Sequence, residues 1–584
     1  MKRRIWISVG VLLAGCCVVL AIGALEQAMK AERELPALLP EGALLSIEAR
    51  DFGGLLREWN SSEEKRAWLT SDNHSAFSNS RLFTRLTQAQ DEFSAAAGVP
   101  ADDSLLENVA GKESCLGLYD IGNLEFVYVT HLDQQGIEKT PLWQTRSKFE
   151  QRTEAGTAFY VHKDPQSSRT AAFAARDGWL ILGTREDLVA GVLDRLAGTS
   201  SHSLLNEGWF AEAVKQAAGP RGDLRMVLNL EKIVPSPYFR SYWVQKNITE
   251  MKQYASAVSD LYRSRESYRE ERVLLRRAGT AVAPQGDARA LAALAPEDAA
   301  FYAAQASPDA ENLLWTLREN LLETKPGRQA ASYTTAPAEA TAENTGSAAQ
   351  LDVQIDKAPV AVKQSDAFQP LRSLLIAAQP DAALEVYSTR APKDGVFVSL
   401  QTAMVVSAAR GWDENAVRQA LTQALLPGLT AGGLGVQWEK RAGNDKQSGA
   451  AGEYFALDGA VPIYFAMRGK QLLLASDSIL LEELLARSQK ATPAKGRDEL
   501  TYAALFRHTQ EQGNFTRLMA QLDLAGHRGE ADRQAESTSD QSPAFFSGNA
   551  ASFSRAFSKV ESERIEEKDR GVTVTQTVTY QWAR

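Results

Sequence analysis

Cys115 and His131 are residue types that together could form a nucleophile and its base, because an activated thiolate needs a nearby imidazole. Cys115 lies in the apolar run Cys-Leu-Gly-Leu-Tyr, which is typical of a small buried hydrophobic residue. His131 lies in a separate strand-like run, and nothing in the spacing predicts that the two side chains meet. We therefore predict no catalytic role for either residue.

Ser62 and Lys65 have the Ser-x-x-Lys spacing of one motif of penicillin-binding enzymes, and residues 71–73 read Ser-Asp-Asn, which is a second motif. In those enzymes the second motif comes from a distant part of the fold, whereas here it directly follows the first. The third motif, Lys-Thr-Gly, does not occur in the sequence. A hydroxyl at Ser61 or Ser62 is instead typical of a helix N-cap. We predict that neither Ser62 nor Lys65 is catalytic.

No pattern in the sequence predicts a metal or cofactor site. The histidines are scattered, without an HExxH motif and without cysteine pairs at ligand spacing. The stretch from Gly432 to Gly435 lacks the spacing of a phosphate-binding loop and is typical of a tight turn before a strand. The histidines are His74, His131, His162, His202, His508 and His527.

The composition is that of an ordinary folded protein. The 584 residues predict two to four domains, since domains usually hold about 100–200 residues. Hydrophobic residues make up 44% and charged residues 23%, so most of the chain is expected to fold. The net charge is −9 with basic and acidic residues interspersed, which leaves no positive surface for a phosphate backbone and excludes nucleic acid as the expected partner.

Residues Ile5–Leu25 are apolar, uncharged and long enough to cross a membrane as a helix. Three basic residues precede them, so we predict a cytoplasmic stub at 1–4, a transmembrane anchor at 5–25 and an extracytoplasmic remainder. Two alternatives use the same pattern. The segment could be a signal peptide cleaved near 21–23, or the run ending at Cys16 could be a lipobox whose cysteine is acylated, making the protein a lipoprotein.

Two pairs of segments indicate an internal repeat. Leu38–Ala43 is echoed by Leu294–Ala299 at an offset of 256 residues, and the run from Trp179 is echoed by the run from Gln471 at an offset of 292. In the second pair, each run predicts a strand, then a helix N-cap at Thr184 or Ser476, then a helix. We predict two related α+β domains with mainly antiparallel sheets.

The predicted domain boundaries follow from this repeat. The first copy covers 26–240 and the second covers 291–584, with a low-complexity insertion at 326–363 that would account for the difference between the two offsets. Between the copies, apolar residues recur at spacings of three and four from Val244 to Tyr262, which predicts a helical connector at 241–290. The alternation from Val572 to the end predicts a closing strand.

The repeat resembles uncharacterised bacterial envelope proteins of the domain-of-unknown-function family numbered thirty-three fifty-two. The residues that carry the resemblance are the Leu-Pro-Glu-Gly-Ala start at Leu39, the segment Gly178–Asp187, and the segment Ser203–Phe210. The resemblance implies an envelope protein and implies no activity or site.

The leading hypothesis for function is therefore a non-catalytic protein that binds or scaffolds a protein or a cell-wall component in the bacterial cell envelope, anchored through residues 5–25. Two linked copies would raise the effective concentration of each binding surface. The alternative is an anchored envelope hydrolase or transferase whose site is assembled from residues distant in sequence. A third hypothesis is a carrier for an apolar ligand.

Overall fold

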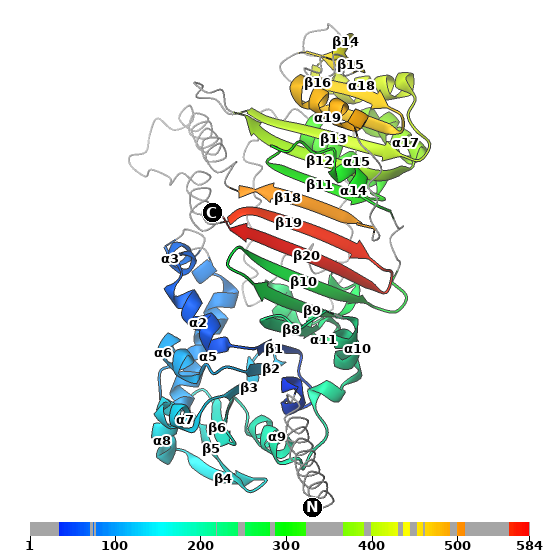
Figure 1. Ribbon diagram of the computed structural model, residues 1–584. Coiled ribbons are helices and arrows are strands. Elements are labelled where there is room, and N and C mark those ends of the chain that lie inside the picture. Colours follow the sequence, from blue (N-terminus) through cyan, green and yellow to red (C-terminus); the bar gives the residue numbers. More distant parts are fainter. Residues whose placement is uncertain are drawn as a thin grey trace, which may run out of the picture. The chain divides into compact units, whose positions relative to one another are not determined.

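The computed structural model forms two compact units (Figure 1). One unit comes from residues 1–54 and 89–212, and the other from residues 55–88 and 213–584. The described residues are 34–70, 74, 77–217, 219–242, 251–280, 286–322, 366–390, 399–429, 436–443, 452–458, 462–490, 499–508 and 560–582.

The structure contradicts the predicted single-pass membrane protein with an extracytoplasmic remainder. Within the described ranges, no helix is both long and apolar enough to span a membrane. The helix α5 (Arg81–Ala97) has 17 residues and carries several charges, whereas a span needs about 20 mostly apolar residues. The predicted anchor at Ile5–Leu25 and the alternative acylation site at Cys16 lie outside the described residues.

The first unit contains a seven-stranded antiparallel sheet in the order β4-β5-β6-β7-β3-β2-β1. The central strands β3, β6 and β7 are largely buried, as expected for a sheet covered on both faces, whereas the edge strand β4 is polar and mostly exposed. The strands are β1 (Leu45–Ala49), β2 (Ser114–Asp120), β3 (Glu125–His131), β4 (Glu150–Glu154), β5 (Thr157–Lys163), β6 (Thr170–Arg176) and β7 (Trp179–Gly183).

Helices cover both faces of this sheet. On one face, Ile137 and Leu142 of two short helices pack with Phe173 in a buried cluster. On the other face, Val189 of α9 meets the backbone of β7 at Gly183. The helices are η1 (Leu35–Leu38), α6 (Asp103–Val109), α7 (Gln134–Lys139), α8 (Pro141–Thr145), η2 (Arg146–Lys148), α9 (Glu186–Ala197) and η3 (Leu204–Asn206). Residues of α2 (Phe52–Ser61), α5 and α10 (Gly208–Gln216) are divided between the units.

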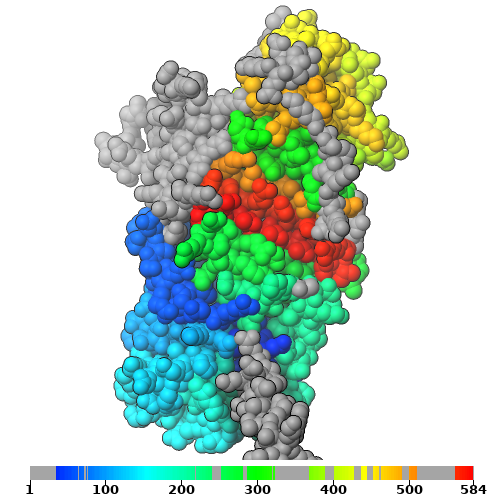
Figure 2. Space-filling view, in the orientation of Figure 1, coloured from blue at the N-terminus to red at the C-terminus, as the bar shows by residue number. Residues whose placement is uncertain are grey.

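The second unit contains a longer antiparallel sheet in the order β14-β15-β16-β17-β13-β12-β11-β18-β19-β20-β10-β9-β8. Figure 2 shows β19 and β20, in red, at the surface of this unit. The strands are β8 (Leu224–Asn229), β9 (Tyr254–Arg263), β10 (Ser267–Arg276), β11 (Phe301–Ala306), β12 (Pro380–Arg390), β13 (Ser399–Ala408), β14 (Glu439–Gly443), β15 (Gly452–Leu457), β16 (Ile463–Arg468), β17 (Gln471–Ala475), β18 (Tyr502–Arg507), β19 (Val560–Asp569) and β20 (Thr573–Trp582).

Two buried clusters flank this sheet. Leu421 of α18 packs with Phe465 and Leu474 on one face, and Leu484 of α19 packs with Leu473 on the other. The helices of the second unit are α3 (Glu63–Leu69), α11 (Leu230–Ile233), α12 (Pro237–Tyr242), α14 (Arg289–Ala292), α15 (Ala310–Leu317), η4 (Arg318–Leu322), η5 (Asp366–Phe368), α17 (Gln369–Ala378), α18 (Glu414–Leu429) and α19 (Ser478–Lys490).

The seven strands of the first unit have the same order as β14-β15-β16-β17-β13-β12-β11 in the second. One row of directly paired residues crosses each set, and we call these two rows the aligned rows. The first is Ile47, Leu116, Tyr128, Leu182, Phe173, Tyr160 and Gln151. The second is Ala303, Glu385, Met404, Leu474, Phe465, Phe455 and Lys440.

The aligned rows correct the predicted role of the insertion at 326–363, which itself lies outside the described residues. Ile47 and Ala303 are 256 residues apart, and Leu182 and Leu474 are 292 apart, as in the two sequence echoes. However, Tyr128 and Met404 are 276 apart, so the offset grows over several connections. One insertion does not account for it, because surface connections vary in length throughout.

The predicted fold class, a transmembrane helix followed by two tandem domains, is wrong in two respects. The described residues contain no spanning helix, and their twenty strands build large antiparallel sheets in units that interleave along the sequence. The helical connector is also wrong over Tyr254–Arg276, which forms β9 and β10. There, Ser256, Val258 and Asp260 are buried at a period of two. The boundaries 26–240 and 291–584 stay predictions.

Thr184 and Ser476 are not helix N-caps, contrary to the prediction. The helix after Thr184 begins at Glu186, and the cap of α19 is Asp477, whose carboxylate accepts from the Leu480 amide. The Thr184 hydroxyl instead accepts from the Phe126 amide at 2.9 Å. The Ser476 hydroxyl likewise accepts from the Thr402 amide at 2.9 Å. Each hydroxyl therefore ties the end of one strand to the neighbouring strand.

Candidate functional site

The structure gives Ser62 and Lys65 structural partners. Ser62 is the N-cap of α3, where its hydroxyl accepts from the Lys65 amide at 3.0 Å and donates to the Trp59 carbonyl at 2.7 Å. The Lys65 ammonium donates to the Asn60 side chain at 2.7 Å. These contacts agree with the predicted helix start, and residues 71–73 lie outside the described residues.

Cys115 and His131 lie on neighbouring strands with different surroundings. Cys115 is fully buried in β2, opposite Val129 of β3, as expected for a small core residue. His131 ends β3, and its imidazole packs edge-on against the Trp179 ring with centroids 5.2 Å apart. The Cys115 thiol is thus buried away from solvent, while the His131 imidazole packs against the Trp179 ring.

The histidines within the described ranges have separate partners. His162 contacts the Ala96 carbonyl at 2.7 Å, His202 contacts Glu41 at 3.3 Å, and His508 lies 3.8 Å from Glu563. Over the described residues, no three His, Cys, Asp or Glu side chains converge in a group that could hold a metal ion.

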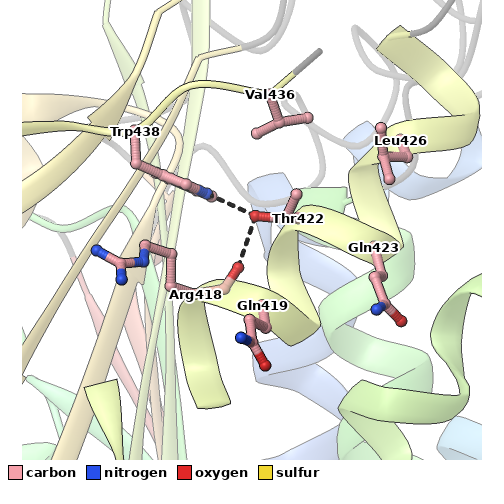
Figure 3. Close-up of a pocket in the computed structure, with 7 residues that line it drawn as sticks. All are labelled: Arg418, Gln419, Thr422, Gln423, Leu426, Val436 and Trp438. Atoms are coloured by element: carbon pink, nitrogen blue, oxygen red, sulfur yellow. Dashed lines mark hydrogen bonds between the residues drawn. The ribbon is translucent and has the colours of Figure 1, made fainter. Parts of the chain in front are cut away.

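A cavity of about 490 Å³ lies between α18 and the segment that leads into β14 (Figure 3). We call it the α18 groove. It forms because α18 is amphipathic: its apolar side, which includes Val417, Leu421 and Leu425, is buried in the core, while its polar side faces outward. The groove is lined by Arg418, Gln419, Thr422, Gln423, Leu426, Val436 and Trp438.

Two hydrogen bonds fix the wall of the α18 groove. The Trp438 indole nitrogen donates to the Thr422 hydroxyl at 2.9 Å, and this hydroxyl donates to the Arg418 carbonyl at 2.7 Å (Figure 3). On its other side, the Trp438 ring packs edge-on against Phe465, with centroids 4.9 Å apart and planes at 84°. The indole is therefore held rigidly between the helix and the sheet.

Arg418 is the charged residue of the α18 groove. Its guanidinium donates to the Asn415 side chain at 2.7 Å and lies 5.7 Å above the Phe455 ring, so its partners among the described residues are neutral. Gln419 and Gln423 project from adjacent turns of the same helix and are exposed (Figure 3). A guanidinium can hold a carboxylate, and the exposed carboxamides on the same helix can pair with peptide-like groups.

The cations next to the α18 groove differ from Arg418 because carboxylates neutralise them. Lys440 of β14 contacts Glu453 at 2.5 Å, and this hydrogen bond raises the pKa of Lys440. Arg441 is paired with Glu439 at 2.5 Å and also with Asp458. Arg418 is therefore the cation that remains open to an incoming anion in this part of the described structure.

The corresponding place in the first unit is filled by a tryptophan. Phe149, directly before β4, packs edge-on against Phe173 at 5.0 Å, as Trp438 does against Phe465. Tyr160 is covered by Trp143 of α8, with centroids 5.9 Å apart. In the second unit, Arg418 lies over the corresponding ring.

Sequence reasoning missed all seven lining residues of the α18 groove. The nearby stretch Gly432–Gly435, a predicted tight turn, lies outside the described residues. The runs around Tyr160 and Phe455 echo each other at an offset of 295 residues, whereas Phe149 and Trp438 are 289 residues apart. The strand pairing, and not the echo, therefore places Trp438 where Phe149 lies in the first unit.

No family model matches the chain, and no curated protein matches it. Two solved structures of TP0453 resemble part of it. Crystal form I has 10% identity and a TM-score of 0.22, and the match covers 43% of this chain and 82% of that one. Crystal form III has 10% identity and a TM-score of 0.21, covering 43% and 83%. The resemblance to the family numbered thirty-three fifty-two stays a prediction.

Proposed function

We propose that this chain is a non-catalytic binding or scaffolding protein of the bacterial cell envelope and that the α18 groove is its binding site. The observation that carries the proposal is the state of Arg418, a guanidinium whose partners among the described residues are neutral, on the same helix as two exposed glutamines. A site of this kind offers charge and hydrogen bonds without a nucleophile. The envelope setting is supported by the sequence resemblance alone.

The groove also has the rigidity that a binding site requires. Thr422 and Trp438 are engaged in hydrogen bonds and ring packing, so they shape the wall and leave recognition to Arg418 and the glutamines. A preformed wall reduces the entropy that binding must overcome. The Ser62 and Cys115 side chains, the nucleophile candidates of the sequence, are a helix cap and a buried core residue.

Crosslinking in the native cell tests this proposal. A photoreactive amino acid replaces Gln423 in the groove or, as a matched control, the exposed Gln581 of β20. We expect an adduct at position 423 that is absent at position 581 and is lost when Arg418→Gln is added. Arg564→Gln, which removes an exposed arginine of β19, should leave the adduct. The proposal is refuted if no adduct forms at position 423, or if the adduct also forms in the Arg418→Gln variant.

A further inference from the structure

The strand that leaves the α18 groove is an edge strand. Within the described residues β14 pairs with β15 alone, so its other side presents backbone N–H and C=O groups. Val436 and Trp438 line the groove, and the chain continues from Trp438 directly into β14. A single extended ligand can therefore lie in the groove and along the strand. Strand addition to a free sheet edge is a recurrent way of binding peptides.

The spacing of the polar groups fits an extended peptide. Gln419 and Gln423 are four residues apart on α18, so they are separated by about 6 Å along the helix axis. In an extended chain, every second peptide group points the same way at a repeat of about 6.6 Å. Each carboxamide can donate to one of these groups and accept from it, which matches alternate peptide units.

The charges select which peptide binds. Lys440 and Arg441 on β14 are already paired with Glu453, Glu439 and Asp458, so an incoming carboxylate would have to displace these partners to bind there. The partners of Arg418 in the described part of the chain are neutral, so the groove is complementary to one carboxylate. A guanidinium and a carboxylate make paired, charge-assisted hydrogen bonds.

Resting on the proposed function, we infer that the ligand of the α18 groove is an extended peptide that adds to the edge of β14 and places a carboxylate on Arg418. The carboxylate is either an acidic side chain or the carboxyl terminus of the peptide. The first unit has no equivalent arrangement in its described residues, because Trp143 covers Tyr160 where Arg418 lies over Phe455.

Selection from a display library of random octapeptides on the purified full-length chain tests this inference. We expect the enriched peptides to bind the Arg418→Gln variant at least about tenfold more weakly, as for the loss of a charge-assisted hydrogen bond. Binding to the Arg564→Gln control should be unchanged. Replacing the acidic residue by its amide, or amidating the carboxyl terminus, then identifies the source of the carboxylate.

Backbone methylation of the selected peptide tests strand addition itself. Successive N–H groups of a strand point to opposite sides, so N-methylation of one alternate set should abolish binding and methylation of the other set should spare it. Equal effects of both sets overturn strand addition. Failure to enrich any peptide, or equal binding to Arg418→Gln, overturns the peptide class. If the crosslink at position 423 still depends on Arg418, the proposed function stands and only the ligand class is wrong.

Discussion

The edge of the sheet in the first unit and the corresponding edge in the second share one framework and differ in what covers it. In both, two aromatic rings stack across neighbouring strands, Tyr160 on Phe173 at 5.2 Å and Phe455 on Phe465 at 4.9 Å. The difference lies in the helices that follow β3 and β13. The first unit uses the short helices α7, α8 and η2, whereas the second uses the single 16-residue helix α18.

This difference indicates which residues can change without disturbing the sheet. The stacked rings belong to the core, where a change of volume disturbs tightly packed neighbours. The covering helix meets them from outside, so its outer residues can change from a packed tryptophan to an arginine with little effect on the sheet. We therefore expect the framework to determine stability in both units and the α18 groove to determine binding in the second.

The largest expected effect concerns the shared framework. Phe173 is 1% exposed and Phe465 is fully buried, so Phe173→Ala and Phe465→Ala should each reduce the free energy of unfolding by about 3–5 kcal/mol. Hydrogen exchange followed by mass spectrometry should place the loss of protection in β5–β7 for the first variant and β15–β17 for the second. If one variant costs less than about 1 kcal/mol, the two frameworks are not equivalent.

The next effect compares Trp143 and Arg418, the residues that lie on the corresponding rings of the two units. Trp143→Ala should destabilise the first unit by about 2 kcal/mol, less than for a fully buried tryptophan because the side chain is only half-buried. Arg418→Ala should change unfolding by less than about 0.5 kcal/mol, as for most surface substitutions, yet abolish the crosslink at position 423. Denaturant unfolding and crosslinking yield measure the two effects. If Arg418→Ala destabilises the protein but crosslinks normally, Arg418 contributes to stability and not to binding.

Sequence reasoning reached the framework through its repeated strands. The echo of the run from Trp179 by the run from Gln471 pointed to β7 and β17, which hold the same place in the two strand orders. It failed where local patterns are ambiguous. Apolar residues spaced by three and four from Val244 to Tyr262 suggest a helix, but part of this segment forms the strand β9. Its pairing with β8 and β10, which the sequence pattern does not reveal, makes it a strand.

The α18 groove could not be derived from the sequence because its walls meet only in the folded chain. Arg418 and Gln423 are ordinary outward residues of an amphipathic helix, and solvation is the default reading for such a face. Trp438 follows the helix and is placed by Phe465, a residue further along the chain. Likewise, the sequence does not say that the described partners of Arg418 are neutral, since this depends on where Glu453 and Asp458 lie.

A smaller effect tests the hydrogen-bonded wall of the α18 groove. Thr422→Val removes the hydroxyl that accepts from Trp438 and leaves the indole N–H without this partner, so we expect a loss of about 1–2 kcal/mol in unfolding free energy. Thr422→Ser keeps the hydroxyl and serves as the control. Peptide binding should weaken with Thr422→Val only. If both variants behave equally, ring packing against Phe465 alone holds Trp438 in place.

A further prediction asks whether function lies outside the compared edges. Ser62→Ala should cost about 1 kcal/mol because a helix cap is lost, and Lys65→Ala, Cys115→Ala and His131→Ala should cost a similar amount or less. None should alter the crosslink at position 423 once abundance is equalised by immunoblotting. A variant of normal fold and abundance that removes all function would restore the enzyme hypothesis.

The smallest expected effect compares two aspartates that follow corresponding strands. Asp164 follows β5, where the Ser167 hydroxyl and amide donate to it and lower its pKa. Asp458 follows β15, where hydrogen bonds from Arg441 and then from the Tyr464 hydroxyl lower its pKa. Each lowered pKa contributes stability above the unfolded value of about 3.9, and this contribution is lost as the pH falls through the folded pKa.

The two causes respond differently to salt, which makes the comparison measurable. Roughly 1 M salt shortens the screening length to about 3 Å and weakens the attraction between Arg441 and Asp458, while the neutral donors of Ser167 are unaffected. We expect the pKa of Asp458, followed by carbon NMR of its carboxyl group, to rise toward the ordinary value in high salt and that of Asp164 to stay low. Arg441→Gln should raise the pKa of Asp458 in the same direction without added salt. If both aspartates respond equally to salt, the ion pair with Arg441 does not set the pKa of Asp458. Arg441 would then not be neutralised by Asp458, and Arg418 would not differ from it as a binding site for an anion.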